Sequence, residues 1–213
     1  MIRYVQAHDP DDRVITHGAK ILAEGGLVAY PTDSSWGIGC SSESKAGLEA
    51  LSRLREDKRS QFSLICSDVS QISSVSNLDT TVFKIIKRHI PGPYVFVLDA
   101  IKKIEKKIAV KRREVGIRVP DHQVPIRLVR ELGVPVFSLT ASRDMVDVYS
   151  EEPGFAEEKL FEEGWELEDI PGIDLIIDSG ESLERKLSTV VRLSYGLTRL
   201  LRQGKGTWDE EDT

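Results

Sequence analysis

The spacing of apolar residues divides the chain into helices and strands. Residues 12–24 place apolar side chains at intervals of three and four, the period of one helix face, and Gly25–Gly26 follows directly. Short apolar runs bounded by glycine, proline or small polar residues are typical of strands. The expected helices cover 12–24, a stretch that begins at 41–43 and carries Leu48, Leu51 and Leu54, 79–90 and 124–133; the expected strands cover 27–30, 62–68, 94–100, 114–121, 134–142, 173–180, 188–194 and 197–204.

The order of these elements predicts the fold class. Helices and strands alternate through most of the chain, and its end is rich in strands. This order favours an α/β fold of mixed α+β character, in which helices flank one strongly twisted mixed sheet, over a regular doubly wound parallel fold. A chain of 213 residues fits one domain. It can bury about 70% of the surface that its unfolded form exposes.

The net charge of −6 is distributed unevenly along the chain. Residues 151–169 contain nine acids and one lysine, and the segment 209–212 adds four acids, so the rest of the chain carries a net charge of +6. We therefore expect a mildly basic domain over 1–207, interrupted by an acidic insert over 147–170 and followed by an acidic tail over 208–213.

The most basic stretch reads KKIEKKIAVKRR, in which seven cations accompany one glutamate. Such a cluster is typical of a surface that faces RNA or phosphate, although a solvated face of a helix or hairpin has the same composition. No interleaved aromatic residues mark a platform for base stacking. The candidate RNA-binding residues are Lys102, Lys103, Lys106, Lys107, Lys111, Arg112 and Arg113.

Several classes of function find no support in the sequence. It contains no GxxxxGK[ST] loop, GxSxG elbow, HExxH helix or Cys/His metal spacing, and we expect no protein-bound metal. Cys40 and Cys66 lie in apolar surroundings, which is typical of reduced thiols in a cytoplasmic protein. The longest apolar runs have five or six residues, too few to span a membrane. Among the histidines, His122 directly after Pro120–Asp121 is the candidate for a site.

The stretch VAYPTDSSWGIGC, residues 28–40, carries the strongest candidate chemistry. Pro31 removes a backbone donor, and residues 32–35 place four small polar side chains after it. These residues form either an ordinary capped loop or the floor of a ligand site. Three other segments, IRVPDH, FSLTASR and HIPGPY, combine the same residue types. Because loops converge at strand ends in α/β sheets, the four segments predict one pocket for a small zwitterion or a phosphate.

These segments, together with PGPYVFVL and STVVRLS…LLRQG, resemble the YrdC/YciO family in order and spacing over residues 13–205, and most of all its YciO branch. The resemblance implies one α/β domain with a concave, basic cavity. In the family's threonylcarbamoyl-AMP synthases, this cavity binds ATP with Mg²⁺, L-threonine and bicarbonate. A carbamate of threonine attacks the α-phosphate and releases pyrophosphate, in the first step of t6A modification of tRNA. Several members bind double-stranded RNA or tRNA, which the resemblance adds as partners.

The resemblance also implies ligand contacts for residues at matching motif positions. Thr32 is expected to contact the amino acid, and Arg118 of the R-V-P motif is expected near its carboxylate or the nucleotide. Trp36 stands where a tyrosine is common, and it is either a packing residue or a stacking lid. The full set of expected substrate- and nucleotide-binding residues is Thr32, Trp36, Arg55, Lys58, Arg59, Arg118, Ser138, Thr140, Ser142, Ser188 and Arg202.

Three positions depart from the synthase pattern. Where synthases carry K-x-R-P, this chain has RLREDKRSQF, so Asp57 takes the arginine position and Lys58 or Arg59 has to substitute. Ser142 replaces an asparagine, and Val95 replaces a threonine. An acid beside a triphosphate is unfavourable by about a few kcal/mol at low effective dielectric.

Three functions are therefore compatible with the sequence. The chain is a nucleotidyltransferase that forms threonylcarbamoyl-AMP or performs a related adenylyl transfer. Alternatively, it is a nucleotide- or RNA-binding module of the same fold without fast turnover. In the third reading, the acidic insert and tail recruit a partner protein.

Overall fold

A computed structural model describes residues 1–54, 62–102, 104, 114–143 and 157–209 of the chain. The described strands are β1 (Ile2–Tyr4), β2 (Val28–Tyr30), β3 (Gly37–Ser41), β4 (Ser63–Ile65), β5 (Tyr94–Asp99), β6 (Glu114–Arg118), β7 (Val136–Thr140), β8 (Leu175–Asp178), β9 (Thr189–Ser194) and β10 (Leu197–Arg202). The described α-helices are α1 (Asp12–Ala23), α2 (Lys45–Arg53), α3 (Val69–Ser73), α4 (Thr80–His89) and α6 (Gln123–Leu132), and two 3₁₀ turns are η1 (Glu157–Lys159) and η2 (Gly164–Leu167).

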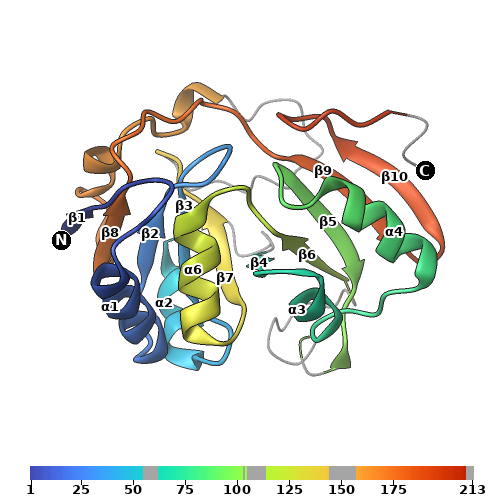
Figure 1. Cartoon of the computed structure of the whole chain (residues 1–213), viewed down its shortest axis with the longest axis horizontal. Helices are drawn as coiled ribbons and strands as arrows, with labels where there is room; N and C mark the ends of the chain where they lie inside the picture. The colour runs from blue at the N-terminus through green and yellow to red at the C-terminus, as the bar shows by residue number, and fades with distance from the viewer. Residues whose placement is uncertain (55–61, 103, 105–113, 144–156, 210–213) are drawn as a thin grey trace.

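The ten strands form one mixed sheet in the order β1-β8-β2-β3-β7-β4-β6-β5-β9-β10 (Figure 1). β2 pairs parallel with β8 and antiparallel with β3, and β5 pairs parallel with β9 and antiparallel with β6. The expected mixed α/β fold with helices on a mixed sheet is therefore confirmed.

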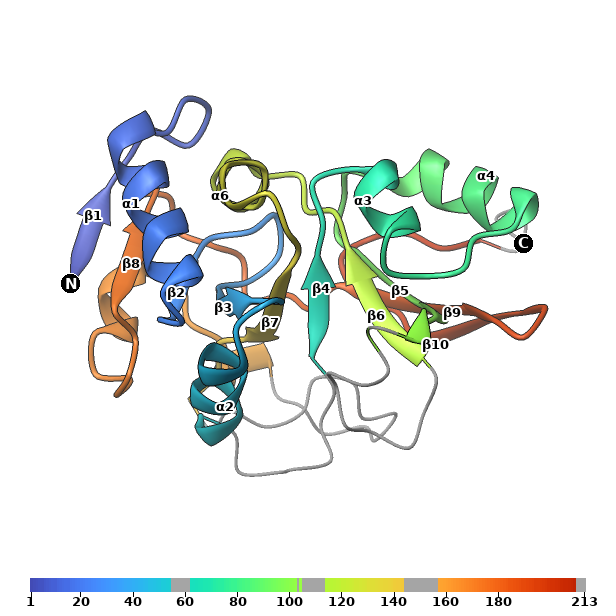
Figure 2. The ribbon, with the colours of Figure 1, turned by 90° about the horizontal axis from the view of Figure 1, so that it is seen from below.

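Helices lie on both sides of this sheet. α1 and α6 pack against each other and bury Ile15 and Leu128 with Val28 of β2 and Leu175 of β8. Figure 2 shows α2 on the opposite side of the sheet from α1 and α6. α4 lies across β5 at the other end of the molecule (Figure 1). The sheet is consequently shielded from solvent along much of its length.

The helix ends follow the signals in the sequence. Asp79 caps α4 by accepting a hydrogen bond from the backbone N–H of Val82, and Ser44 caps α2 in the same way. α6 ends at Gly133, whose φ of 77° is a left-handed conformation that favours glycine. The expected Asp79 and Gly133 caps are thus confirmed.

The sequence analysis does not predict strand β3. The glycines of β3 explain why the pattern misses this strand and how it fits between β2 and β7. The sequence GIGCS is short, and its two glycines have a low preference for strands. A Cβ atom on Gly39 would lie 2.4 Å from Val136 Cγ1 and 3.1 Å from the Phe137 carbonyl oxygen. Glycine therefore allows β3 to lie closely between β2 and β7, both of which it pairs with.

The described part of the acidic insert, residues 157–170, folds onto the domain. Glu157, Glu158, Glu168 and Asp169 are exposed, whereas Leu160, Phe161 and Leu167 are buried in the core. Arg143 forms an ion pair with Glu166, whose pKa would be raised by burial but is lowered by hydrogen bonds from the backbone N–H groups of Glu163 and Glu162 and by Arg143. This segment is consequently a wall of the domain; residues 147–156 lie outside the described part.

The two cysteines and the lengths of the helices bear on where the protein is located in the cell. Cys40 and Cys66 are buried and unbonded to each other, and burial raises the pKa of the Cys40 thiol to about 12. In the described parts of the chain, no helix combines the length and the apolar character needed to cross a bilayer. Cytoplasmic location stays a prediction.

Candidate functional site

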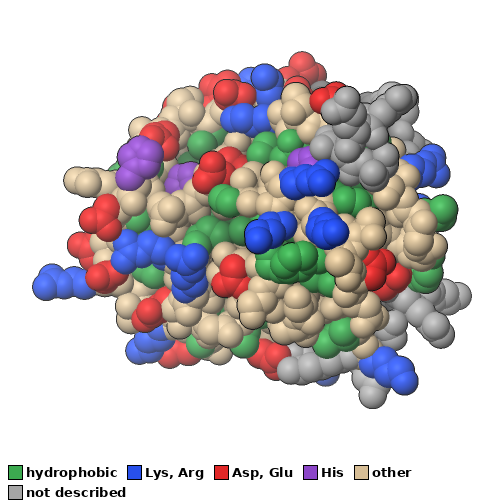
Figure 3. Space-filling model, turned by 45° about the vertical axis from the view of Figure 1, so that its right-hand side comes forward, with side chains coloured by type: hydrophobic (Ala, Val, Ile, Leu, Met, Phe, Trp, Pro, Cys, Tyr) green, Lys and Arg blue, Asp and Glu red, His purple; other side chains and the backbone are tan. Residues whose placement is uncertain are grey.

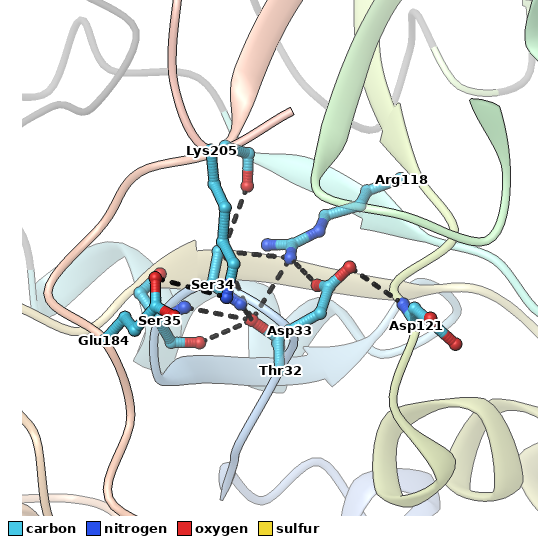
Figure 4. Close-up of polar contacts among 9 residues, drawn as sticks. Thr32, Asp33, Ser34, Ser35, Arg118, Asp121, Glu184 and Lys205 are labelled. Atoms are coloured by element: carbon cyan, nitrogen blue, oxygen red, sulfur yellow. Dashed lines mark hydrogen bonds and ion pairs between the residues drawn. The ribbon is translucent and has the colours of Figure 1, made fainter. Parts of the chain in front are cut away.

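The candidate site lies where the loop that follows β2 meets the end of β6 and the residue before β9 (Figure 4). This loop comprises residues 32–35, and Thr32, Ser34 and Ser35 are buried although they are polar. Because buried polar groups require hydrogen-bond partners, the contacts of these side chains define what the loop is built around.

Thr32 fixes the shape of the loop. Its Oγ1 accepts hydrogen bonds from the backbone N–H groups of Ser34 and Ser35, at 3.2 Å each, and donates to the carbonyl oxygen of Ser35 at 2.6 Å. These bonds close a local turn around one hydroxyl. The short polar run after Pro31 is therefore an ordered structure held by its own side chains.

Arg118, the last residue of β6, joins this loop to a distant strand of the sheet. Its Nη2 donates to Ser34 Oγ at 2.9 Å and to Thr32 Oγ1 at 3.2 Å, and it forms an ion pair with Asp33. The second Asp33 oxygen accepts a hydrogen bond from the backbone N–H of Asp121 at 3.0 Å. Only 7% of the Arg118 side chain and 12% of the Asp33 side chain are exposed, so water screens this pair weakly.

Ser188 completes the group. Its Oγ lies 3.2 Å from Ser34 Oγ, and its carbonyl oxygen accepts hydrogen bonds from Arg202 Nη2 at 2.7 Å and Nε at 3.2 Å. The structure thus brings together Thr32, Arg118 and Ser188, and Arg202 is bonded to the backbone of Ser188. We call the connected side chains of Thr32, Asp33, Ser34, Arg118 and Ser188 the hydroxyl cluster.

The two predicted residues of β7 lie in different surroundings. Ser138 is buried inside the sheet, where its Oγ accepts a hydrogen bond from the Tyr30 hydroxyl at 2.8 Å. Burial raises the pKa of Tyr30 above its ordinary value, so the phenol keeps the proton that makes this bond. Thr140 is half-buried at the end of β7, opposite Gly37 of β3. Ser138 is consequently part of the core packing.

Trp36 and Ser142 are both buried in this structure, and their ligand roles stay a prediction. Trp36 is completely buried, and its Nε1 donates to the carbonyl oxygen of Glu162 at 3.2 Å, so the indole packs in the core and presents no face for stacking. Ser142 is also completely buried and forms an isolated β-bridge with Leu160. The acidic segment after residue 156 covers both positions, which the local sequence around them does not reveal.

Other predicted residues cannot be placed. Arg55, Lys58 and Arg59, with Asp57, lie outside the described residues. The same holds for six residues of the basic stretch, which are Lys103, Lys106, Lys107, Lys111, Arg112 and Arg113. Lys102 is described and exposed. A basic cavity therefore stays a prediction.

The structure adds residues that the motif comparison missed. Asp33 belongs to the quoted stretch, but its ion pair with Arg118 links positions 85 residues apart and has no local signal. Lys205 and Glu184 form an ion pair with an Nζ–Oε2 distance of 3.5 Å, and Figure 4 shows both beside the hydroxyl cluster. Lys205 directly follows the R-x-G positions in the sequence, which could have indicated it.

His122 borders the cluster at the start of α6. Its Nδ1 accepts a hydrogen bond from the backbone N–H of Val124 at 3.2 Å, so it caps the helix. Burial lowers the pKa of His122 despite the opposing effect of Glu181, Asp33 and Asp121. The neutral imidazole is therefore the form that the folded protein favours.

The cluster combines opposite charges with several hydroxyls. Asp33 neutralises Arg118, so the base of the site is nearly neutral as a unit. Arg118 Nε is buried and has no hydrogen-bond partner among the residues that the structure describes. Over those same residues, no group of three or more His, Cys, Asp or Glu side chains is placed to hold a metal ion. The arrangement suits a small polar ligand that carries both charges.

The fold and the cluster define a class, that of α/β domains in which hydroxyl-rich strand ends from distant segments meet beside one arginine. The family model for Sua5, YciO and YrdC proteins, described as telomere recombination, matches residues 20–204. The chain belongs to this family.

Relatives of two kinds match the chain. The uncharacterized protein YciO of Escherichia coli K12 is 30% identical over 205 residues, which is 95% of each protein. The crystal structure of E. coli YciO covers 97% of both chains with a TM-score of 0.82. A threonylcarbamoyl-AMP synthase of Vibrio vulnificus is 29% identical over 127 residues, 58% of this chain and 68% of the relative.

A more distant likeness shows the fold alone. The structure of P. abyssi Sua5 complexed with L-threonine has a TM-score of 0.79 at 23% identity. It covers 96% of this chain and 57% of that protein. This chain thus corresponds to part of the longer P. abyssi protein.

The buried ion pair generates the first prediction. Arg118→Met leaves the Asp33 carboxylate buried without its partner, and we expect a loss of about 3 kcal/mol in the free energy of unfolding. The double variant Asp33→Asn/Arg118→Met removes both charges and should lose less than the single variant. Urea unfolding measures all three, with Arg199→Met on the exposed face of β10 as a control that changes stability by less than about 0.5 kcal/mol. A double variant less stable than Arg118→Met would contradict the pairing.

The lowered pKa of His122 predicts a dependence of stability on pH. The unfolded chain takes up a proton near pH 6.5 more readily than the folded one, so stability should fall as pH decreases from about 7.5 to 5.5. His122→Asn keeps a helix-capping acceptor and removes this titration. The difference between the unfolding free energies at the two pH values should be smaller in the variant. Equal differences in both proteins would show that His122 does not titrate as described.

Proposed function

We propose that the hydroxyl cluster is the base of a site for L-threonine and ATP, and that the protein forms threonylcarbamoyl-AMP from these substrates and bicarbonate. The observation that carries the proposal is the contact of Arg118 Nη2 with Thr32 and Ser34, whose hydroxyl in turn meets Ser188. The synthase relatives support the reaction, since their name describes it.

The charges of the cluster support an amino acid as one ligand. A zwitterion presents a carboxylate to Arg118 and an ammonium group to Asp33, so it replaces one ion pair with two and leaves the net charge unchanged. The unused donor at Arg118 Nε is a further group for a carboxylate oxygen. Thr32 Oγ1 already makes five hydrogen-bonding contacts, so in this proposal Thr32 positions the loop and Arg118 binds the carboxylate.

The proposed reaction depends on positioning. The carbamate of threonine has to approach the α-phosphorus of ATP opposite the bond to pyrophosphate, and no protein nucleophile takes part. Ordered hydroxyls around Arg118 hold the amino acid in one orientation, and cations near the phosphates stabilise the charge that develops on them. ATP enters with its Mg²⁺ as a substrate. Whether Lys58 or Arg59 reaches the phosphates stays a prediction.

A second candidate function is the binding of RNA. α4 presents Lys84, Lys87 and Arg88 on its exposed face and contains no acid. Figure 3 shows Lys and Arg side chains gathered near the middle of one face of the molecule, beside exposed hydrophobic side chains. Such a surface attracts a phosphate backbone without reading its sequence. Together with the stretch 102–113, α4 supports a contact with tRNA or double-stranded RNA.

The enzymatic proposal predicts release of pyrophosphate that requires both L-threonine and bicarbonate. Arg118→Lys and Thr32→Ala should lower this rate at least tenfold, because they remove the guanidinium fork and the hydroxyl that orders the loop. Thr198→Ala, on exposed β10, is the control and should retain the rate. Circular dichroism establishes that each variant is folded. A folded wild-type protein that releases no pyrophosphate above the background would refute the proposal.

The RNA proposal predicts affinity that falls steeply with salt. The logarithm of the binding constant should decrease linearly with the logarithm of salt concentration, because bound cations release counterions from the RNA. One variant replaces Lys106, Lys107 and Lys111 by glutamine, and a second replaces Lys84, Lys87 and Arg88 by glutamine. Each should weaken binding and reduce the slope by about three units if all three residues contact phosphates. A slope near zero in the wild-type protein would exclude this function.

A further inference from the structure

The last described residues form a strap across the end of the sheet. We call residues 203–209 the C-terminal strap. The backbone N–H of Gly204 donates to Thr189 Oγ1 at 2.9 Å, and the hydroxyl of Tyr94 donates to the Thr207 carbonyl oxygen at 2.8 Å. The Trp208 ring stacks on His89, with 4.9 Å between ring centroids. These contacts hold both ends of the strap against the domain.

The strap fixes Lys205 beside the hydroxyl cluster. Its backbone N–H donates to the carbonyl oxygen of Leu187 at 2.8 Å, which places Lys205 next to Ser188. Figure 4 shows the Lys205 side chain running from the strap toward the loop of residues 32–35, where it meets Glu184. One third of the Lys205 side chain is exposed, so a ligand in the site can reach it.

Two other described cations of this site, Arg118 and Arg202, are already engaged inside the domain. Arg118 forms a buried ion pair with Asp33, and the Arg202 guanidinium donates to the Ser188 carbonyl oxygen. Lys205 instead forms an ion pair at 3.5 Å with Glu184, whose side chain is 56% exposed. Exposed ion pairs contribute little to stability, so a polyphosphate, with its higher charge, can displace Glu184 from Lys205.

We infer that Lys205 binds the phosphates of the nucleotide and that Glu184 holds its side chain in place until the nucleotide arrives. This inference rests on the proposed function. According to the family resemblance, synthases carry an arginine where this chain has Asp57. Lys205 would supply the positive charge that is missing at that position. The strap delivers this cation from the end of the domain, far in sequence from the loop that supplies cations in the synthases.

Equilibrium binding of ATP tests the inference, with binding of L-threonine as an internal reference. Lys205→Ala should weaken ATP binding about tenfold and leave threonine binding unchanged, because one charge-assisted contact to phosphate is lost. Lys205→Arg should stay within about threefold of the wild-type affinity, because the charge is kept. Lys186→Ala is the matched control, because Lys186 Nζ also lies 3.5 Å from Glu184 Oε2, and it should lose far less affinity for ATP than Lys205→Ala does.

Glu184→Gln gives a second, independent measurement. Removing the competing carboxylate should tighten ATP binding a few-fold in the wild-type background and have no effect in Lys205→Ala. Wild-type affinity for ATP in Lys205→Ala, or an equal loss in Lys186→Ala, would overturn the inference and leave the proposed function standing. A folded wild-type protein that binds neither ATP nor threonine would overturn both.

Discussion

The buried ion pair between Arg118 and Asp33 is the interaction on which the candidate site depends. It joins the loop after β2 to the end of β6, two strands that are separated in the sheet by β3, β7 and β4. A guanidinium inside the protein is stable only if its charge and its donors are met. Asp33 balances the charge, and Asp33, Thr32 and Ser34 all accept hydrogen bonds from Nη2, so the contacts that hold Arg118 also order the loop. The contacts of Arg118 therefore stabilise the fold and also set the geometry of the candidate site.

The sequence predicts those parts of the fold that local pattern controls. α1 and α4 follow from their helical period and from capping residues such as Asp79. β3 does not, because its glycines are selected by the close approach of Val136 on a neighbouring strand, which no local pattern records. The same limit applies to the site. Thr32 and Arg118 lie at recognisable strand ends, whereas the partner of each is set by the order of strands in the sheet.

The acidic segment over residues 157–170 covers two residues that the family motifs place at the ligand site. Ser142 follows β7 at a position that faces ligand in the synthases, according to the family resemblance. Here Leu160 forms a bridge with it, and Trp36 donates to Glu162 of the same segment. Both residues consequently contribute to packing, and the described part of the acidic segment, residues 157–170, packs onto the domain through Leu160, Phe161 and Leu167. Recruitment of a partner by the exposed acids of this segment stays a prediction, and the proposed nucleotide site has to draw on residues other than Trp36 and Ser142.

The two proposed substrates, L-threonine and ATP, need different charges in the site. Because Asp33 balances Arg118, the hydroxyl cluster matches a zwitterion but offers little net attraction to a polyphosphate. An additional cation has to meet the phosphates, and it has to lie near the cluster without entering the buried pair. Lys205 satisfies both conditions, since its backbone is held next to Ser188 and its present partner is an exposed carboxylate. Amino-acid and nucleotide recognition are thereby assigned to different segments of the chain, the loop after β2 and the C-terminal strap.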